Sequence, residues 1–399
     1  MRNLNTMIIY FNSSTLNVDR SLASNNFLAI RRPSLFKYCI KNLTPPYCSR
    51  SVRCCRTKAD MLKLITSMPK NFHPTKISEF NCNKVLLPSS NELARSVLPI
   101  IPKSASKLFG GKAEVDDWIS LDASYKKNID MRSKLILSNR ENIIQCKNIS
   151  YPACREVFKY VLGYILVKYP FVFKLLELEG KVYLLNKITK GKYRVDNFER
   201  SNPIRLFKII CRSIQEDINV VELDKDDYCL TATLTTCPVG WDPKERIGET
   251  MAKLHRNAPG WENGKGKYAK TITSSFTNTV RDERIVKRAN LFIFNTDELF
   301  LLEYNPGIPS PKDIGNKPGF RYTDLHLRRE YQSFVRLPES SAILFTVKTY
   351  IEPMTNLSLP ELLELQKLVS VWGPSEIEYH KSNSWLPVFN KYISEKEKR

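Results

Sequence analysis

Polar and charged side chains crowd a short stretch of this sequence, directly before one of its most apolar segments. In HLRREYQSFVRLP (326–338), four of them recur at intervals of two or four residues: Arg328, Glu330, Gln332 and Arg336. A β-strand repeats every two residues, so in an extended chain these side chains would share one face. Such a face either meets solvent or forms the polar wall of a pocket, and the spacing fits both.

Histidine is the other residue type here that could hold a metal ion, and the chain has four: His73, His255, His326 and His380. His380 follows EIEY on a polar helix, where we expect it at the surface. His255 ends a predicted helix (243–256) that begins with Asp242 as N-cap and a proline at its first position. A histidine there could be favoured by the helix dipole alone, or it could project as a metal or haem ligand.

A haem group would account for both features. Its two propionates need cationic partners, and arginine binds a carboxylate through two parallel hydrogen bonds. Arg288 precedes the apolar run ANLFIF and so adds an arginine to Arg328 and Arg336. One histidine ligand, two or three arginines and apolar strands are typical of a haem site. An exposed strand face explains the same residues.

Basic charge is concentrated at the N-terminus. Of a net charge of +21 over 399 residues, residues 1–58 hold ten Lys/Arg against the single acid Asp19, or +9, which leaves +12 for the rest. This Arg-, Ser- and Asn-rich segment is typical of a mitochondrial transit peptide, with a disordered basic extension as the alternative. We therefore predict an intracellular protein, either mitochondrial or cytoplasmic.

Several partner classes are not expected. The moderately basic body lacks RNA-binding and zinc-finger motifs, so we predict no nucleic-acid partner. Lysines and a proline interrupt the most apolar later segment (157–176), which predicts a buried helix and no membrane span.

The ten cysteines form no CxxC pair, which is typical of reduced thiols in an intracellular protein. Complete motifs for NAD, flavin or iron–sulfur binding are missing.

Helical and strand-like patterns alternate from about residue 95 onward. Helices are predicted at 124–138, 153–169, 203–216, 243–256, 358–370 and 386–396. Strands are predicted at 181–186, 228–236, 289–294, 298–304, 333–337 and 342–351, with a hairpin turn at Asn295-Thr296-Asp297. Consecutive strands flanked by helices favour an α+β fold with a mostly antiparallel sheet and surrounding helices.

The same patterns suggest a division of the chain. We assign residues 1–58 to the basic extension, 59–94 to a linker, 95–385 to the main domain and 386–399 to a C-terminal helix and charged tail.

Three stretches carry a more specific pattern. They are YCLTATLTTCPVGWDPKERIGETMAKLH (228–255), VKRANLFIF (286–294) and LHLRREYQSFVRLPESSAILFTVKTYIEPM (325–354). Together they resemble the haem-dependent oxidative N-demethylase family, also called the HRQ family. Its patterns are P-x-x-W, P-x-E-K-x-G and I-H, then R-x-N-W, then L-R-x-E-x-Q, R-L-P and L-F-T-I-R-T-Y. With the upstream segments 116–137 and 151–173, the resemblance covers roughly residues 95–385.

The resemblance carries over to individual positions. The matching residues are His255 for the I-H histidine, Arg288 and Asn290 for the R-x-N pair, and Arg328, Glu330, Gln332 and Arg336 for the last run. Two positions depart from the pattern. Leu291 replaces the tryptophan after R-x-N, and we expect this change to reshape the pocket wall. Lys348 replaces the arginine of F-T-I-R-T-Y, which keeps the positive charge but loses the planar guanidinium that can bind a carboxylate through two hydrogen bonds.

The resemblance implies a PAS-like haem domain that demethylates a small amine with O2 and electrons from a separate flavin and iron–sulfur reductase. It implies haem b with His255 as the axial ligand to iron and His326 as the rival ligand. Arg288, Asn290, Arg328 and Arg336 would bind the cofactor, and Glu330 and Gln332 would be catalytic. The alternatives are a non-catalytic haem sensor or carrier, and a haem-free homologue in which the polar row forms an internal network.

Overall fold

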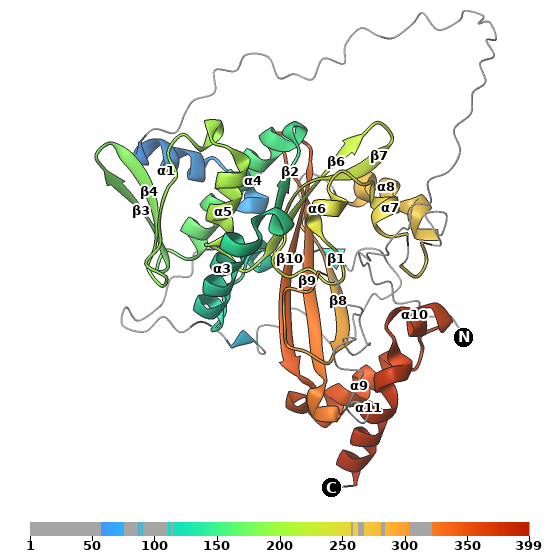
Figure 1. Ribbon diagram of the computed structural model, residues 1–399. Helices are drawn as coiled ribbons and strands as arrows, with labels where there is room; N and C mark the ends of the chain where they lie inside the picture. The colour runs from blue at the N-terminus through green and yellow to red at the C-terminus, as the bar shows by residue number, and fades with distance from the viewer. Residues whose placement is uncertain are drawn as a thin grey trace, which may run out of the picture.

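Two antiparallel sheets with helices around them form the part of the chain described by the computed structural model (Figure 1). The structure describes residues 57–75, 87, 89–90, 111–112, 115–256, 258–261, 267–280, 284–302 and 321–398. The predicted basic extension, up to residue 56, lies outside these residues. None of the described helices combines the length and apolar character that crossing a bilayer requires.

The helices are α1 (Lys58–Thr66), α3 (Tyr125–Ile143), α4 (Tyr151–Lys168), α5 (Pro203–Cys211), α6 (Pro243–Arg246), α7 (Met251–Leu254), α8 (Lys267–Thr279), α9 (Leu359–Val369), α10 (Pro374–Tyr379) and α11 (Ser382–Glu397). The strands are β1 (Gly111–Lys112), β2 (Ile144–Cys146), β3 (Phe173–Leu178), β4 (Lys181–Asn186), β5 (Lys192–Arg194), β6 (Asp217–Asp224), β7 (Asp227–Leu234), β8 (Val286–Phe294), β9 (His326–Arg336) and β10 (Ile343–Pro353). This content confirms the predicted α+β class.

The larger sheet supplies the frame of the molecule. Its seven strands run in the order β1-β8-β9-β10-β6-β7-β2, and the smaller sheet has the order β3-β4-β5. All named strand pairs are antiparallel, and β9 and β10 pair along eleven residues, from Arg336 opposite Ile343 to His326 opposite Pro353. Because side chains alternate across a strand, each strand of the larger sheet presents one set of residues to each face.

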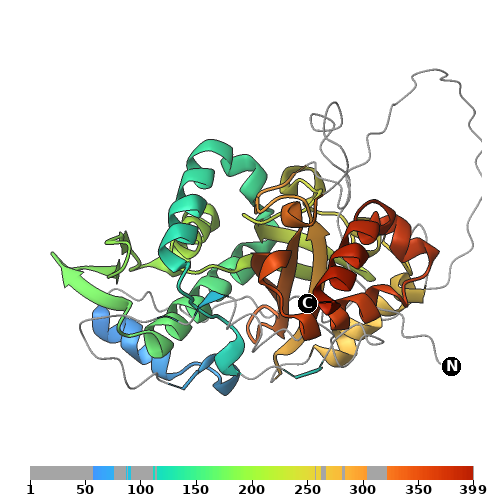
Figure 2. The same cartoon turned by 90° about the horizontal axis from the view of Figure 1, so that it is seen from below.

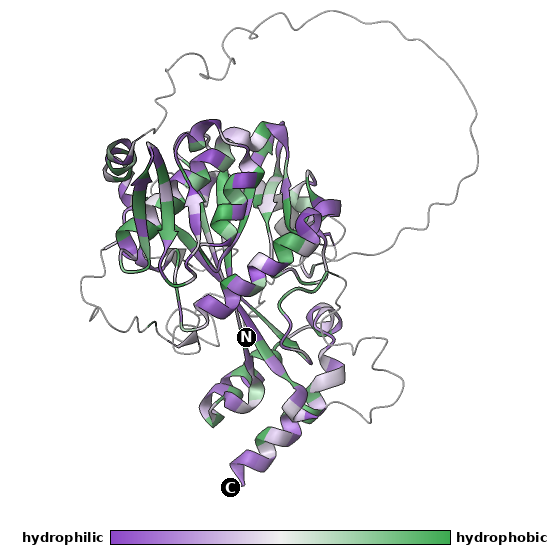
Figure 3. Cartoon of the chain, turned by 60° about the vertical axis from the view of Figure 1, so that its left-hand side comes forward, coloured by the Kyte–Doolittle hydropathy of each residue, from purple (hydrophilic) through white to green (hydrophobic). Residues whose placement is uncertain are grey.

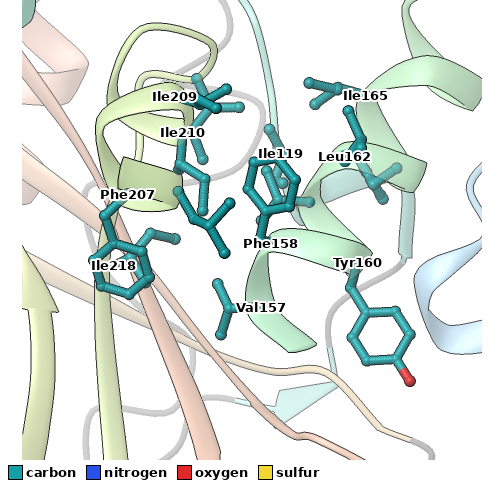
Figure 4. Packing of buried hydrophobic residues seen from close by; sticks show 14 of the residues in the cluster. Ile119, Val157, Phe158, Tyr160, Leu162, Ile165, Phe207, Ile209, Ile210 and Ile218 are labelled. Atoms are coloured by element: carbon teal, nitrogen blue, oxygen red, sulfur yellow. The ribbon is translucent and has the colours of Figure 1, made fainter. Parts of the chain in front are cut away.

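One face of the larger sheet packs on α3, α4 and α5, to the left of the sheet in Figure 1. In Figure 4, Val157 and Phe158 of α4 lie against Phe207 and Ile210 of α5 and Ile218 of β6. Each is at most 1% exposed, and burial of such a side chain stabilises the fold by about 1.5–3 kcal/mol. Hydrophobic residues accordingly follow the central strands and the adjoining helices in Figure 3.

The C-terminal helices cover the lower part of the sheet. Seen from below in Figure 2, α9 and α11 lie beside the strands. Trp385, Phe389 and Ile393 of α11 pack into one cluster with Leu291 and Ile293 of β8. Helix α11 therefore packs against the larger sheet, and it overlaps both the predicted main domain (95–385) and the predicted C-terminal helix and charged tail (386–399).

The segment assigned to a linker also contains a packed helix. Helix α1 begins at a capping box formed by Thr57 and Asp60, whose side chains accept hydrogen bonds from each other's backbone N–H groups. Its residues Met61 and Ile65 are buried in the core that surrounds α4. Helix α1 thus packs against the main body through Met61 and Ile65.

Two predicted elements differ from the structure. The predicted strand at 298–304 and its hairpin are wrong over the described residues, because Leu301 forms only an isolated parallel bridge with Val239. The predicted helix at 243–256 is broken into α6 and α7, and Gly248 lies between them with φ of +87°. That left-handed conformation is easily reached by glycine and interrupts helical hydrogen bonding.

His380 is buried, which corrects the expectation of a surface position. It is 3% exposed, and its ring stacks on Trp372 with centroids 4.1 Å apart. Burial lowers the pKa of His380 to about 3, because a cation in an apolar environment is disfavoured. His380 is therefore buried, although the residues of α10 that precede it in the sequence are polar.

Candidate active site

A cavity lies on the face of the larger sheet opposite α3, α4 and α5. The space not filled by atoms there measures about 690 Å³ and includes a part that is open to solvent. Its lining is mostly apolar and comes from the sheet, α7, α8 and the segment between β7 and α6: Val239, Trp241, Met251, Ile272, Phe276, Phe334, Phe345 and Val347. Four polar residues proposed from the sequence also line it: His255, Arg288, Glu330 and Gln332.

His255 lies directly after α7, where Thr250 caps the helix and places Met251 one turn before the histidine. The imidazole is 1% exposed, and its ring stacks on Trp261 with centroids 4.6 Å apart. Nδ1 lies 2.7 Å from the carbonyl oxygen of Met251. Because a carbonyl can only accept, Nδ1 carries the proton, and the lone pair of the neutral ring lies on Nε2.

Burial keeps this imidazole neutral. Desolvation, together with the nearby Arg288 guanidinium, lowers the pKa of His255 to about 3 and outweighs the Met251 hydrogen bond, which raises it. A neutral imidazole whose Nδ1 is fixed by a carbonyl is the usual form of a histidine metal ligand. His255 is therefore prepared for ligation through Nε2.

Acid should destabilise the chain in the absence of haem. Between about pH 6.5 and pH 3, the unfolded state protonates His255 and His380 while the native state does not, so stability falls as the pH is lowered. The slope is up to about 1.4 kcal/mol per pH unit for each histidine. We expect His380→Phe to reduce the slope of the free energy of unfolding against pH by the contribution of one histidine, measured by urea denaturation at a series of pH values. An unchanged slope in this variant would contradict the assignment.

The polar row of β9 is buried. Arg328, Glu330 and Gln332 are 0%, 8% and 3% exposed, so the interpretation as a solvated strand face is wrong. Their partners on β8 are equally buried, and the register sets Arg288 opposite Gln332 and Asn290 opposite Glu330. The row is therefore an internal polar wall built by two paired strands.

Hydrogen bonds link this wall into one network. Arg288 donates to Gln332 Oε1 (3.2 Å), and Gln332 Nε2 donates to Glu330 Oε2 (3.1 Å). Asn290 Nδ2 donates to the same Glu330 oxygen (3.2 Å), while Arg328 pairs with Glu330 Oε1 at 3.2 Å. Glu330 thus accepts from three side chains, which fix its carboxylate at the edge of the cavity.

Arg328 holds the wall to the neighbouring loops. Its guanidinium donates to the carbonyl oxygens of Cys237 (2.6 Å) and Leu299 (3.3 Å) in addition to its pairing with Glu330. The N–H groups of Arg328 thus donate to other groups of the protein. Of the arginines proposed for cofactor binding, Arg288 is the one that lines the cavity.

Four of the eight proposed residues do not line the cavity. Asn290 and Arg328 contact Glu330 behind the lining, and Arg336 and His326 lie elsewhere on β9. Arg336 donates to the carbonyl oxygens of Val280 and Phe276 and to Tyr228 Oη at the far end of β9. His326 starts β9, and its Nδ1 lies 3.1 Å from the Asp324 carbonyl oxygen. Neither side chain belongs to the lining of this cavity.

The sequence analysis missed the contribution of β6 and β7. Asp217, Asn219, Thr235 and Cys237 all line the cavity. The stretch DINVVELD (217–224) alternates polar and apolar residues in two halves, but the phase changes between Val220 and Val221, where the pairing with β7 is also irregular. Its strand was not predicted. The alternation of Asp217 and Asn219, two residues apart on one strand face, was the available signal.

Both departures from the family pattern lie on the opposite face of the sheet. Leu291 is one residue from Asn290 and packs in the cluster with α9 and α11, so the expectation that it reshapes the pocket wall is wrong. Lys348 is 1% exposed and forms an ion pair with Asp122 at 2.9 Å. Burial raises the pKa of Asp122, but the Lys348 charge and hydrogen bonds outweigh this and lower it.

The residues of the cavity fit a haem better than a metal ion held by protein ligands alone. Within the described ranges, no three His, Cys, Asp or Glu side chains gather as a metal site. A haem iron needs few protein ligands, because the porphyrin supplies four. A neutral buried histidine, apolar walls and one arginine at the lining match that requirement.

A fixed imidazole, a hydrogen-bonded carboxylate and apolar walls meet in one cavity of an α+β fold, as in sites that take a cofactor or small molecule. The chain belongs to the haem-dependent oxidative N-demethylase, alpha subunit-like family, whose sequence model matches residues 111–389. The match confirms the resemblance and spans both sheets and every residue that lines the cavity.

Proposed function

We propose that this protein is a haem-dependent oxidoreductase that removes a methyl group from a small amine. The observation that carries the proposal is a neutral buried His255, fixed through Nδ1, in the same cavity as the buried carboxylate of Glu330. His255 would ligate the iron of haem b through Nε2, and Arg288 would face a propionate. Membership of the alpha subunit-like family supports this assignment.

When bound, the haem would supply the activation of O2 with electrons from outside the chain. The chain's own residues would bind and orient the substrate. Glu330 would attract a protonated amine, and Asn290 and Arg328 would keep its carboxylate in place. Gln332 would direct its amide to the substrate or to a water. The apolar lining would exclude solvent and so strengthen these interactions.

Other parts of the proposal concern context. A separate flavin and iron–sulfur reductase, or another partner subunit, would deliver the electrons, as the description "alpha subunit-like" suggests. The arrangement of the larger sheet and its helices would be PAS-like. The location would be mitochondrial if residues 1–58 act as a transit peptide, and cytoplasmic otherwise.

The first experiment is to express the chain with a haem precursor, record its absorption spectrum and quantify haem as the pyridine haemochrome. We expect a Soret band and near-stoichiometric haem. Formaldehyde release from a panel of small secondary amines, with O2 and a reductase system, then separates an enzyme from a haem sensor or carrier. A chain that takes up no haem on titration would refute the enzyme and the sensor together.

Glu330→Gln should impair amine turnover with little loss of haem. The amide keeps the size of the side chain but removes the charge that would pair with an ammonium ion, a loss of about 1.5–3 kcal/mol. We expect kcat/KM for formaldehyde release to fall about 10- to 100-fold. Glu364→Gln, at an exposed position of α9, is the matched control. Equal activity in both variants would remove Glu330 from the substrate site.

A further inference from the structure

Two cysteines face each other far from the cavity. Cys146 ends β2, at the edge of the larger sheet, and Cys154 lies in the first turn of α4 (Figure 1). Their Sγ atoms are 3.5 Å apart, and both residues are free thiols. A disulfide requires about 2.05 Å between the sulfur atoms, so a movement of about 1.5 Å would bring them to bonding distance.

A serine organises the pair. Ser150 Oγ lies 3.5 Å from Cys146 Sγ and 3.7 Å from Cys154 Sγ. The same hydroxyl lies 2.9 Å from the Lys147 carbonyl oxygen and 3.1 Å from that of Thr231. The turn between β2 and α4 is thereby fixed to β7, and it keeps both sulfur atoms on one side.

The two thiols differ in exposure and acidity. Cys146 is partly exposed, and a hydrogen bond from Cys154 lowers the pKa of its thiol despite the opposing effect of burial. Cys154 is 0% exposed, and burial raises the pKa of its thiol, with the Cys146 interaction adding to the rise. One sulfur atom is thus the accessible nucleophile, and the other is the shielded partner.

We propose that Cys146 and Cys154 form a reversible redox-active dithiol that is oxidised by low-molecular-weight disulfides. The Cys146 thiolate attacks one sulfur of the disulfide RSSR, which forms a mixed disulfide and releases one thiolate. Cys154 then loses its proton, and its sulfur attacks Cys146, which releases the second thiolate. The net exchange converts two protein thiols and RSSR into one protein disulfide and two RSH, so the protein loses two electrons and two protons.

The other described cysteines lack this arrangement. Cys211 and Cys237 are both buried, and burial raises the pKa of each thiol, to about 11 and about 12. Cys229 lies near the outer end of β7, and burial raises its pKa as well. The dithiol site does not depend on haem binding, so its test stands apart from the test of the proposed function.

The test exposes the full chain to glutathione buffers from fully reduced to fully oxidised, traps free thiols with an alkylating agent and maps the peptides by mass spectrometry. We expect Cys146 and Cys154 of the wild-type chain to become protected from alkylation together and to yield a Cys146–Cys154 cross-linked peptide, which disappears when reductant is added. This measurement on the unaltered chain needs no variant to fold.

The variants separate the two roles. Cys154→Ser should stop at the mixed disulfide, with glutathione retained on Cys146, while Cys146→Ser should leave Cys154 unmodified. Cys229→Ser is the matched control and should behave as the wild type. Absence of the cross-linked peptide at every glutathione ratio would overturn the proposal, as would equal adduct formation on Cys154 in the Cys146→Ser chain.

Discussion

Replacing His255 by alanine should abolish stoichiometric haem binding, whereas His326→Ala should leave the Soret band unchanged. His255 is the histidine that lines the cavity, and its Nδ1 is held by the Met251 carbonyl oxygen. His326 lies outside the lining, at the start of β9. Loss of the proposed His255 ligand would leave the haem with apolar contacts and Arg288, and we expect haem affinity to fall at least 100-fold.

The matched comparison controls for damage to the fold. Haem is titrated into each apoprotein, and far-ultraviolet circular dichroism verifies that the alanine variants retain secondary structure. Added imidazole should restore haem binding and the wild-type spectrum in the His255→Ala chain, because it can enter the space left by the side chain. A His255→Ala chain with full haem and an unaltered spectrum would refute the ligand assignment, and loss of haem in His326→Ala alone would transfer the role to His326.

Local sequence patterns predicted the polar wall but not its surroundings. The spacing of Arg328, Glu330 and Gln332 placed them on one strand face, because strand periodicity depends only on backbone geometry. Whether that face met solvent could not be read from β9 alone. It is settled by β8, β10 and α8, which meet β9 only in the folded chain.

The errors have a shared physical cause. His380 lies among polar neighbours on a short helix, yet Trp372 from the preceding segment stacks on its ring and buries it. Leu291 follows a residue of the polar wall, yet alternation turns it toward α9 and α11. In each case packing between neighbouring elements, or the choice between the two faces of a strand, decided the environment. The family resemblance showed which residues match the family pattern, but it did not show toward which face of the sheet each side chain points.

The second large effect concerns Arg132 of α3, which is 0% exposed. Its guanidinium donates to the carbonyl oxygens of Gln215 (3.1 Å) and Glu216 (2.8 Å) and pairs with Asp217 at 2.9 Å. Arg132→Met fills much of the same space but leaves the buried Asp217 carboxylate without its cation. We expect the free energy of unfolding to fall by about 3–5 kcal/mol, measured by urea denaturation.

The loss should also reach the cavity, because Asp217 connects Arg132 to its wall. The Asp217 carboxylate accepts from the backbone N–H groups of Thr236 (2.9 Å) and Cys237 (2.8 Å), and the Cys237 carbonyl oxygen accepts from Arg328. We therefore expect weaker haem binding in the Arg132→Met chain even where it remains folded.

Two further variants test whether the planar guanidinium of Arg132 accounts for the loss of stability. Arg132→Lys keeps the charge but lacks the planar fork, so it should recover only part of the stability. Arg140→Ala, at a side chain 41% exposed on the same helix, should change stability by less than about 0.5 kcal/mol. If Arg132→Met and Arg140→Ala proved equally stable, the buried pair would not hold α3 to the sheet, and the proposed link from α3 to the haem cavity would fail with it.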